Sequence, residues 1–250
     1  MSSPTETDVR VEMLGVGWIS SSAAMWRRGE DPQRRIRFPV PAYLIETESE
    51  RILVDTGLNP AAVGDPRGYY GREEAGLFDL ELEQDVTELV DVGTLTRVVL
   101  THLHFDHVGA LALLPASLPV VVQRREWEAA HDEAAIRRNF FYPRDYAFDD
   151  RELVLVDGDH DLLGDGSVEL LLTPGHTPGH QSIRVGEGLV LGADVAHFAS
   201  TLDDHRFPSF ADSFDAQARS AERLRRLRDG GARVLPGHDP DILRPGQLYP

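Results

Sequence analysis

Three histidines and one aspartate fall within six consecutive residues, and this cluster constrains the chain more than any other feature. The segment 102–107 reads His-Leu-His-Phe-Asp-His and follows an apolar, strand-like run. Because side chains two positions apart on an extended strand point the same way, His102 and His104 can face one metal ion at the end of a strand. Where the chain turns into a helix, Asp106 and His107 are re-aimed and can face a second ion. Lone histidines are usually solvated or packed in a core, but this density predicts a metal site.

The kind of ligand follows from the absence of cysteine in the chain. Without thiolates, a metal must be bound by histidine nitrogen and carboxylate oxygen, a mixture that zinc accepts. The same absence excludes disulfide bonds and cysteine nucleophiles.

The net charge is strongly acidic, since 25 basic residues against 42 acidic ones give 25 − 42 = −17. Such a surface repels the phosphates of nucleic acids and of anionic membranes, so we expect neither as a partner. No apolar run approaches the roughly 18–20 residues of a membrane span. The polar segment 1–8 lacks the basic and apolar parts of a secretory signal. We therefore expect a cytoplasmic protein that acts on a small molecule.

Strand-like and helix-like segments alternate along the 250 residues, which favours sheets covered by helices over an all-α or all-β fold. Since no linker is evident, we expect one domain spanning residues 1–250. Within it, residues 1–37 are expected to form an N-terminal extension that covers the active site or contacts a second copy in a homodimer. The expected strands are 38–45, 52–54, 97–101, 120–122, 153–156, 168–172, 181–185, 189–191 and 234–235, and the expected helices are 80–92, 108–114, 124–136 and 214–228.

The cluster is one of an ordered set of motifs. Residues 101–109 read Thr-His-Leu-His-Phe-Asp-His-Val-Gly and resemble the signature of the metallo-β-lactamase superfamily. The other motifs of that superfamily are resembled, in order, by Asp55-Thr56-Gly57, by the segment Thr173 to His180, by Gly192-Ala193-Asp194 and by Leu235-Pro236-Gly237-His238. The resemblance covers most of the chain, and the ordered set is more specific than the cluster alone.

The resemblance implies an αββα sandwich, in which two mixed β-sheets pack face to face with helices on the outer faces. It also implies two metal ions and seven ligands: His102, His104 and His176 on one ion, Asp106, His107 and His238 on the other, and Asp194 between them. One carboxylate can bridge cations about 3.5–4 Å apart, and two cations lower the pKa of a shared water so that hydroxide forms near neutral pH. We expect two Zn2+ ions, although iron, cobalt or manganese also suits these ligands.

Within the superfamily, the cluster, the aromatic segment 139–143 and the ending at 237–240 are most similar to N-acyl-homoserine lactonases. Those lactonases commonly carry a tyrosine three residues after the bridging aspartate, where this chain has His197. Imidazole can also donate a hydrogen bond or exchange a proton. We therefore expect a hydrolase in which a metal-bridging hydroxide opens a lactone, as in quorum quenching, and Asp106 or His197 protonates the leaving oxygen.

Fold and ligands alone leave other reactions open. The same site suits organophosphate triesters, carboxylic esters or glyoxalase-II-like thioesters. A glutathione thioester is disfavoured because Arg244 is the one basic residue near the C-terminus to hold its carboxylates. A di-iron protein that handles oxygen or sulfur, and a non-catalytic binding module, are the alternatives outside hydrolysis.

The aromatic residues near the motifs have two interpretations. Phe140, Phe141 and Tyr142, with Trp18 and Trp26 from the N-terminal part, either line an apolar channel for an acyl chain or pack as core or dimer contacts. The aromatic segment extends to Phe148.

Two polar residues in the motifs are expected to act on the site indirectly or not at all. Asp55 is expected to orient the ligand loops by hydrogen bonds. His180 follows a Pro-Gly pair, and a structural and a functional role are equally open for it.

Overall fold

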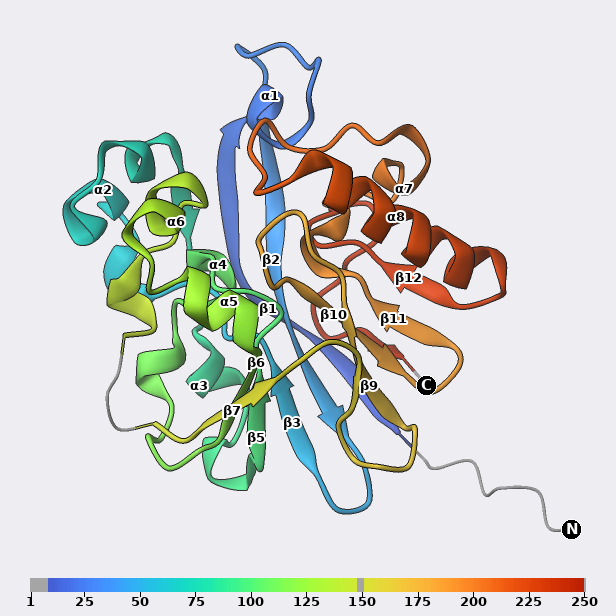
Figure 1. The fold of residues 1–250 in the computed structure, drawn as a ribbon. Helices are drawn as coiled ribbons and strands as arrows, with labels where there is room; N and C mark the ends of the chain where they lie inside the picture. Colours follow the sequence, from blue (N-terminus) through green and yellow to red (C-terminus); the bar gives the residue numbers. More distant parts are fainter. Residues whose placement is uncertain (1–8, 148–150, 250) are drawn as a thin grey trace, which may run out of the picture.

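Two β-sheets lie face to face with helices on their outer sides (Figure 1). The computed structural model describes residues 9–147 and 151–249. The larger sheet contains β1 (Arg10–Ser22), β2 (Arg35–Glu46), β3 (Arg51–Val54), β4 (Asp79–Glu81), β5 (Arg97–Val99), β6 (Val120–Gln123), β7 (Leu153–Val156) and β13 (Leu248–Tyr249). The smaller sheet contains β8 (His160–Asp161), β9 (Val168–Leu172), β10 (Gln181–Val185), β11 (Leu189–Leu191) and β12 (Arg233–Leu235).

Both sheets mix parallel and antiparallel pairs. The larger sheet has the order β13-β1-β2-β3-β5-β6-β7, with β4 also paired to β1, and the smaller has the order β12-β11-β10-β9-β8. In the larger sheet β1 and β2 are antiparallel while β3 and β5 are parallel. In the smaller sheet β9 and β10 are antiparallel while β11 and β12 are parallel. The predicted αββα sandwich with two mixed sheets is therefore confirmed.

Short helices and turns connect the strands. The α-helices are α1 (Ala23–Trp26), α2 (Pro66–Tyr70), α3 (Val86–Leu89), α4 (Phe105–Val108), α5 (Arg124–Ala129), α6 (Glu133–Arg138), α7 (Thr201–Asp204) and α8 (Phe214–Asp229). The 3₁₀ turns are η1 (Pro60–Ala62), η2 (Glu73–Leu77), η3 (Val92–Thr94), η4 (Leu111–Leu113), η5 (Pro143–Asp145) and η6 (Ala193–Val195). None of the helices in the described residues is long and apolar enough to cross a membrane.

Alternate side chains of the central strands point into different hydrophobic cores. Ile52 and Val54 of β3 join a core between the sheets, together with Leu170 and Ile183 of the smaller sheet. Leu53 points the other way and joins a second core that includes residues of α3 and α4. A third core lies between the smaller sheet and α8. Because successive side chains of a strand point to opposite faces, an apolar strand of this kind serves two cores at once.

The N-terminal part of the chain differs from the expectation. Residues 10–22, within the predicted extension 1–37, form β1, which lies inside the larger sheet between β2 and β13. The register of β1 against β2 shifts between Gly15 and Trp18. Across this bulge the residues that join the helix-side core change from even positions, Leu14 and Val16, to an odd one, Ile19, which interrupts the alternation that signals a strand.

Three predicted helices have other boundaries. The helix expected at 108–114 begins earlier, as α4, inside the histidine cluster, and is followed by the separate turn η4. The single helix expected at 124–136 is two helices, because Asp132 accepts a hydrogen bond from Ala135 N and caps a new start. The helix expected at 80–92 is wrong over most of its length, since β4 occupies its beginning and α3 covers only 86–89.

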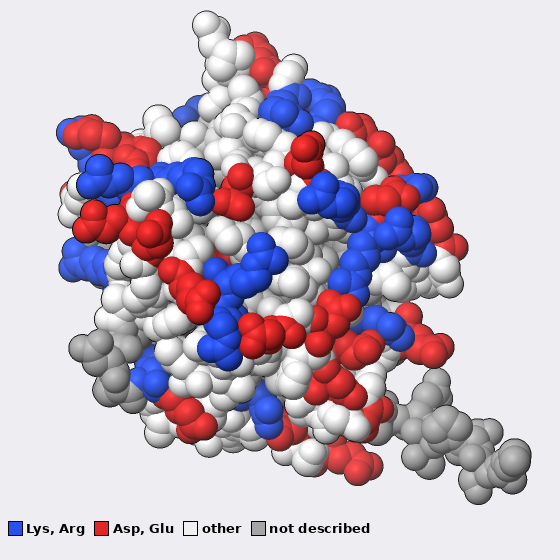
Figure 2. Space-filling view, viewed as in Figure 1, with Lys and Arg blue, Asp and Glu red and all other residues white. Residues whose placement is uncertain are grey.

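Acidic and basic side chains are interspersed over the face seen in Figure 2. Exposed ion pairs include Arg124 with Asp157 and Arg223 with Asp159. Pairs of this kind contribute little to stability, about 0–1 kcal/mol each. On this face the basic residues form no continuous patch of the kind that follows a phosphate backbone.

Candidate metal centre

Seven buried histidine and aspartate side chains gather where four strands end. The loops after β5, β9, β11 and β12 supply them, together with the first turn of α4. They are the seven residues that the motifs predicted as ligands: His102, His104, Asp106, His107, His176, Asp194 and His238. Folding therefore brings together side chains that lie up to 136 positions apart, since 238 − 102 = 136.

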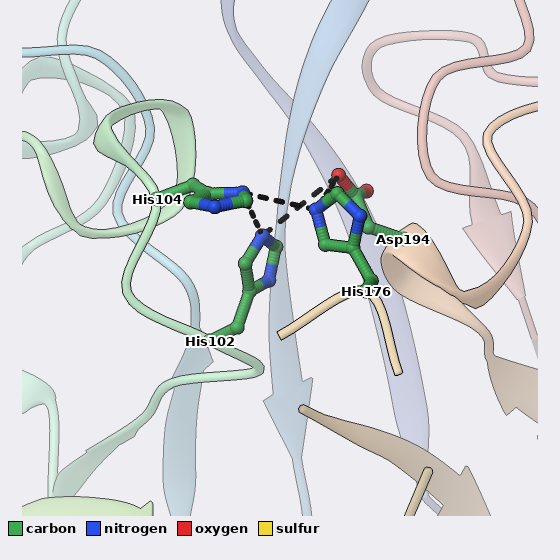
Figure 3. Close-up of side chains that lie close together, drawn as sticks. All are labelled: His102, His104, His176 and Asp194. Carbon is green, nitrogen blue, oxygen red and sulfur yellow. Dashed lines mark hydrogen bonds and ion pairs between the residues drawn. The ribbon is translucent and has the colours of Figure 1, made fainter. Parts of the chain in front are cut away.

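One group of these side chains converges as shown in Figure 3. The Nδ1 atom of His104 lies 3.1 Å from Nε2 of His102 and 2.9 Å from Nε2 of His176. The Oδ2 atom of Asp194 lies 3.2 Å from Nε2 of His176 and 3.8 Å from Nε2 of His102. Three ring nitrogens and one carboxylate oxygen around one point form the donor set of a tetrahedral zinc site.

The other oxygen of Asp194 faces a second group. Its Oδ1 atom lies 3.2 Å from Nε2 of His238 and 3.5 Å from Nε2 of His107. The Oδ2 atom of Asp106 lies 3.5 Å and 3.9 Å from the same two nitrogens. Each oxygen of one carboxylate thus faces a different set of donors, and a cation on each side would be bridged by Asp194.

The remote ring nitrogens show which atoms carry lone pairs. His238 donates from Nδ1 to the carbonyl oxygen of Pro39 at 2.9 Å, and His104 donates from Nε2 to the carbonyl oxygen of Asn139 at 2.6 Å. A neutral imidazole carries one N–H group, so in the neutral form of each ring the nitrogen that faces the cluster is unprotonated and able to bind a metal. A hydrogen bond to the far nitrogen is the usual way in which a metal-binding histidine is oriented.

Asp55 orients two more of the histidines, which confirms its expected role. Its Oδ2 atom accepts from Nδ1 of His107 at 2.7 Å and from the Thr101 hydroxyl at 2.7 Å. The same hydroxyl oxygen lies 3.1 Å from Nδ1 of His102, which donates to it. Asp55 has a left-handed backbone with φ of 60°, an unusual conformation for a residue with a side chain. Strained backbone of this kind concentrates at functional sites.

Several inward-facing atoms of the second group have no hydrogen-bond partner among the described residues. They are Oδ2 of Asp106, Nε2 of His107, Oδ1 of Asp194 and Nε2 of His238. Buried polar atoms are nearly always paired, so four orphans around one point need an explanation. A divalent cation accepts all four lone pairs at once, and the residues present fit that group.

The pKa values follow the distribution of charge. Burial, followed by repulsion from neighbouring imidazoles, lowers the pKa of His102 and His104 well below the usual value, so both rings are neutral. Burial also opposes protonation of His107, but Asp194, Asp55 and Asp106 outweigh it and raise its pKa to about 10, so a cation bound to this group would displace the proton from Nε2. The second group is therefore rich in negative charge, and its carboxylates attract a cation.

Two buried residues hold Asp194 in place. His180 accepts at Nε2 from the backbone N–H of Asp194 at 3.1 Å, so its contacts are structural. Gln217 of α8 donates from Nε2 to the carbonyl oxygen of Asp194 at 3.0 Å. Gln217 was not predicted from the sequence, although it lies on the same helix face as the buried Ala221 and Leu224. A polar residue on an apolar helix stripe was the signal that could have found it.

Glu126 was also missed. Its carboxylate is fully buried on α5 and accepts hydrogen bonds from the backbone N–H groups of Leu103 and Gly179. These partners lie 23 and 53 positions away in the sequence. No local pattern marks such a residue, because the contact exists only in the folded chain.

An apolar pocket opens beside the cluster, and it shows which aromatic residues line a channel and which belong to the core. Trp26, Phe140 and Tyr142 line it, together with His104 and Asp106 of the cluster and with Phe78, Phe105 and Phe210. Phe141 is fully buried against Tyr146 and belongs to the core. Trp18 is not among the residues that line the pocket. The guanidinium carbon of Arg37 lies over its ring, 3.9 Å from the ring centre. Phe148 lies outside the described residues.

His197 adjoins the cluster. Its Nε2 atom lies 3.1 Å from Oδ2 of Asp194, and its ring packs between Trp26 and His238, with centroid distances of 5.2 Å and 5.4 Å. Burial is the main reason why its pKa is lowered to about 4. The ring is therefore neutral at pH 7, and neither of its nitrogens has a hydrogen-bond partner among the described residues.

Comparison with known sequences agrees with this geometry. Residues 35–238 match the Metallo-beta-lactamase superfamily. The chain is 32% identical to the N-acyl homoserine lactonase AttM of Azorhizobium caulinodans, over 94% of this chain and 95% of the relative. It is 31% identical to an N-acyl homoserine lactonase of Bacillus cereus, over 88% of each.

The fold is also similar to those of solved lactonase structures. An N-acyl homoserine lactone hydrolase with the product N-hexanoyl-L-homoserine bound at its catalytic metal centre has a TM-score of 0.82 and 25% identity, over 94% of this chain and 96% of that chain. The dizinc quorum-quenching lactonase AidC has a TM-score of 0.72 at 18% identity, over 97% of this chain and 90% of that chain, and shows the likeness of fold.

Proposed function

The chain belongs to the metallo-beta-lactamase superfamily and is a metal-dependent hydrolase, and we propose that it opens the lactone ring of N-acyl homoserine lactones with two divalent cations. One observation carries the two-ion part: the carboxylate of Asp194 presents one oxygen to the histidines of the first group and the other to His107 and His238. A site for one ion would leave the lone pairs of the other group buried and unpaired.

The ligands in this proposal are His102, His104 and His176 for one ion, Asp106, His107 and His238 for the other, and Asp194 for both. Zinc suits a donor set rich in imidazole nitrogen. When bound, the two cations supply an activated water as nucleophile and polarise the carbonyl of the substrate.

We assign proton transfer to Asp106 and His197. Asp106 lines the apolar pocket and also belongs to the second group of proposed ligands, so it lies where substrate and cation would meet. His197 is neutral and lies beside Asp194, so it can donate or accept one proton at Nε2. A positioned acid or base contributes about 10²–10⁴-fold to a reaction in which an alkoxide leaves.

The pocket supports an acylated substrate. Half of the residues that line it are aromatic, and His104, Asp106 and Asp194 of the cluster also line it. An apolar acyl chain along Trp26, Phe140 and Phe210 would place a polar lactone ring against the cluster, which is the usual arrangement of apolar walls and few polar groups in a ligand site. The names of the relatives point to the same substrate, and one similar solved structure is that of a quorum-quenching N-acyl homoserine lactone hydrolase.

We also propose that residues 1–250 form one domain. The core between the sheets contains Val11 near one end of the chain and Tyr249 near the other. Through α1 the N-terminal segment brings Met25 and Trp26 into the wall of the pocket, which supports a role of this segment in covering the site.

A hydrolysis panel tests the substrate. Zinc-loaded protein is incubated with N-hexanoyl-homoserine lactone, a simple γ-lactone, a paraoxon-type triester, a carboxylic ester and a thioester, and kcat/KM is measured for each. We expect the acylated lactone to have the highest value. Faster turnover of the triester, the ester or the thioester would contradict the lactonase assignment, while the metal-dependent hydrolase would stand.

A further inference from the structure

Glu126 is a fully buried glutamate that faces backbone rather than substrate. It lies on α5, and its side chain points toward the loops that carry the first group of ligands. Burying a carboxylate is unfavourable unless several hydrogen bonds compensate for the lost water. Its position therefore calls for a specific role.

The two carboxylate oxygens bind two different loops. Oε1 accepts from the backbone N–H of Leu103 at 3.0 Å, and Leu103 lies between the ligands His102 and His104. Oε2 accepts from the backbone N–H of Gly179 at 2.8 Å, in the loop that carries His176. One carboxylate thus joins the two segments that deliver the three nitrogens of the first group.

The loop around Gly179 lies directly against α5. A Cβ atom at Gly179 would lie 2.2 Å from the backbone nitrogen of Glu126, closer than real contacts allow. The glycine lets the loop approach the helix closely enough for the hydrogen bond to form. On the opposite side, Ser220 of α8 donates to the carbonyl oxygen of Pro174 at 2.7 Å. Helices on two sides therefore fix the loop that carries His176.

Burial raises the pKa of the Glu126 carboxyl to about 7, although the nearby Thr177 hydroxyl and the backbone N–H groups of Leu103 and Gly179 act to lower it. Burial therefore destabilises the carboxylate form of this side chain. The fold retains it where it joins the two ligand loops, although an apolar side chain would avoid that cost.

We propose that Glu126 is a positioning residue that sets the spacing between His102, His104 and His176 and so determines the affinity of the ion they hold. The inference rests on the proposed two-ion site. The second group, formed by Asp106, His107 and His238, makes no contact with Glu126 among the hydrogen bonds and ion pairs of the described residues. Loss of the carboxylate should therefore affect one ion and spare the other.

The test uses Glu126→Gln, which keeps the shape of the side chain but replaces one accepting oxygen by an N–H donor. Glu128→Gln is the matched control, because Glu128 lies on the same helix and is exposed. Each full-length protein is stripped of metal and titrated with Co2+, and the bound ions are counted by elemental analysis and followed by the visible absorption of the cobalt. Circular dichroism of the metal-free proteins reports their folding.

We expect two ions in the wild type and in Glu128→Gln. In Glu126→Gln we expect one ion with unchanged affinity and one bound about 10–100-fold more weakly, as is typical for residues that orient metal ligands. The absorption of the weakened ion should change, since its ligands are displaced. Glu126→Asp, which keeps the charge but is too short to reach both N–H groups, should show the same selective loss.

Three results would overturn the inference. Folded Glu126→Gln and Glu126→Asp proteins that bind two ions with wild-type affinity would remove the positioning role. Equal weakening of both ions, or failure of the metal-free variants to fold, would assign Glu126 to general stability instead. If the wild type itself binds fewer than two ions, the two-ion proposal fails, and this outcome is distinct because it does not depend on position 126.

Discussion

Asp194 is the residue on which both groups of proposed ligands depend. Its oxygens face opposite ways, and its backbone is held by His180 and Gln217. The side chain therefore cannot rotate toward one group without losing contacts to the other. This places the strongest single-residue effect at position 194 and not at any one histidine.

Asp194→Asn should abolish binding of two ions, because the amide nitrogen cannot act as a ligand. We expect fewer than two ions per chain and a fall in turnover of about 10³-fold or more, since charge stabilisation at the reacting carbonyl is lost. Elemental analysis and lactone kinetics measure both effects. The control is Asp157→Asn, which removes a carboxylate from the surface. Two ions and normal turnover in Asp194→Asn would contradict the bridging role.

His197 should matter for turnover and not for metal content. His197→Phe removes both ring nitrogens while keeping an aromatic side chain next to Trp26. We expect a loss of about 10²-fold or more in kcat with two ions still bound. His197→Tyr, which restores a hydrogen-bond donor, should recover part of that loss. Loss of metal from the phenylalanine variant would instead make His197 a ligand.

At the scale of elements, the turn η5 contains a buried carboxylate that should make stability depend on pH. Burial is the main cause that raises the pKa of Asp145 from 3.8 to about 7. Its stabilising neutral form is fully present below pH 3.8, and stability is lost as pH rises through about 7. Each pKa unit corresponds to about 1.4 kcal/mol, so the whole effect is roughly 4 kcal/mol.

Asp145→Asn removes this titration. Relative to that variant, the wild type should lose roughly 3 kcal/mol of unfolding free energy between pH 5 and pH 8. Urea unfolding of both proteins at fixed zinc concentration measures the difference. Parallel pH profiles for the two proteins would show that the Asp145 carboxyl is not held neutral.

Features formed by residues close together in the sequence could be predicted, and features that depend on distant partners could not. The cluster at 102–107 is contiguous, so its candidate ligands and the neighbouring strand could be predicted from spacing. His176, Asp194 and His238 came from motifs in order, and the structure places all of them together. β1 was not predicted because its bulge between Gly15 and Trp18 interrupts the alternation of buried positions. Glu126 could not be found, since its partners are distant in sequence.

At the scale of the whole molecule, the cluster lies between elements from both sheets, so bound ions should join the two halves. The first group takes His102 and His104 from the larger sheet and His176 from the smaller. A ligand that binds only the folded state stabilises it by about 2.7 kcal/mol at one hundred times its Kd. Metal binding should therefore report on folding as well as on catalysis.

Removal of metal should lower the melting temperature. We expect Tm to fall on addition of a chelator, to recover with Zn2+, and to rise further as the concentration of free zinc increases. Differential scanning calorimetry measures this shift. The melting temperature of Asp194→Asn should respond much less to zinc. A wild-type Tm that is independent of zinc would contradict binding between the two halves.

Anomalous diffraction from crystals of the zinc-loaded protein tests whether Asp194 lies between two bound ions. We expect two zinc peaks per chain, one among His102, His104 and His176 and one among Asp106, His107 and His238, with the carboxylate of Asp194 between them. A single peak in the presence of excess zinc, or two peaks that Asp194 does not bridge, would contradict this arrangement.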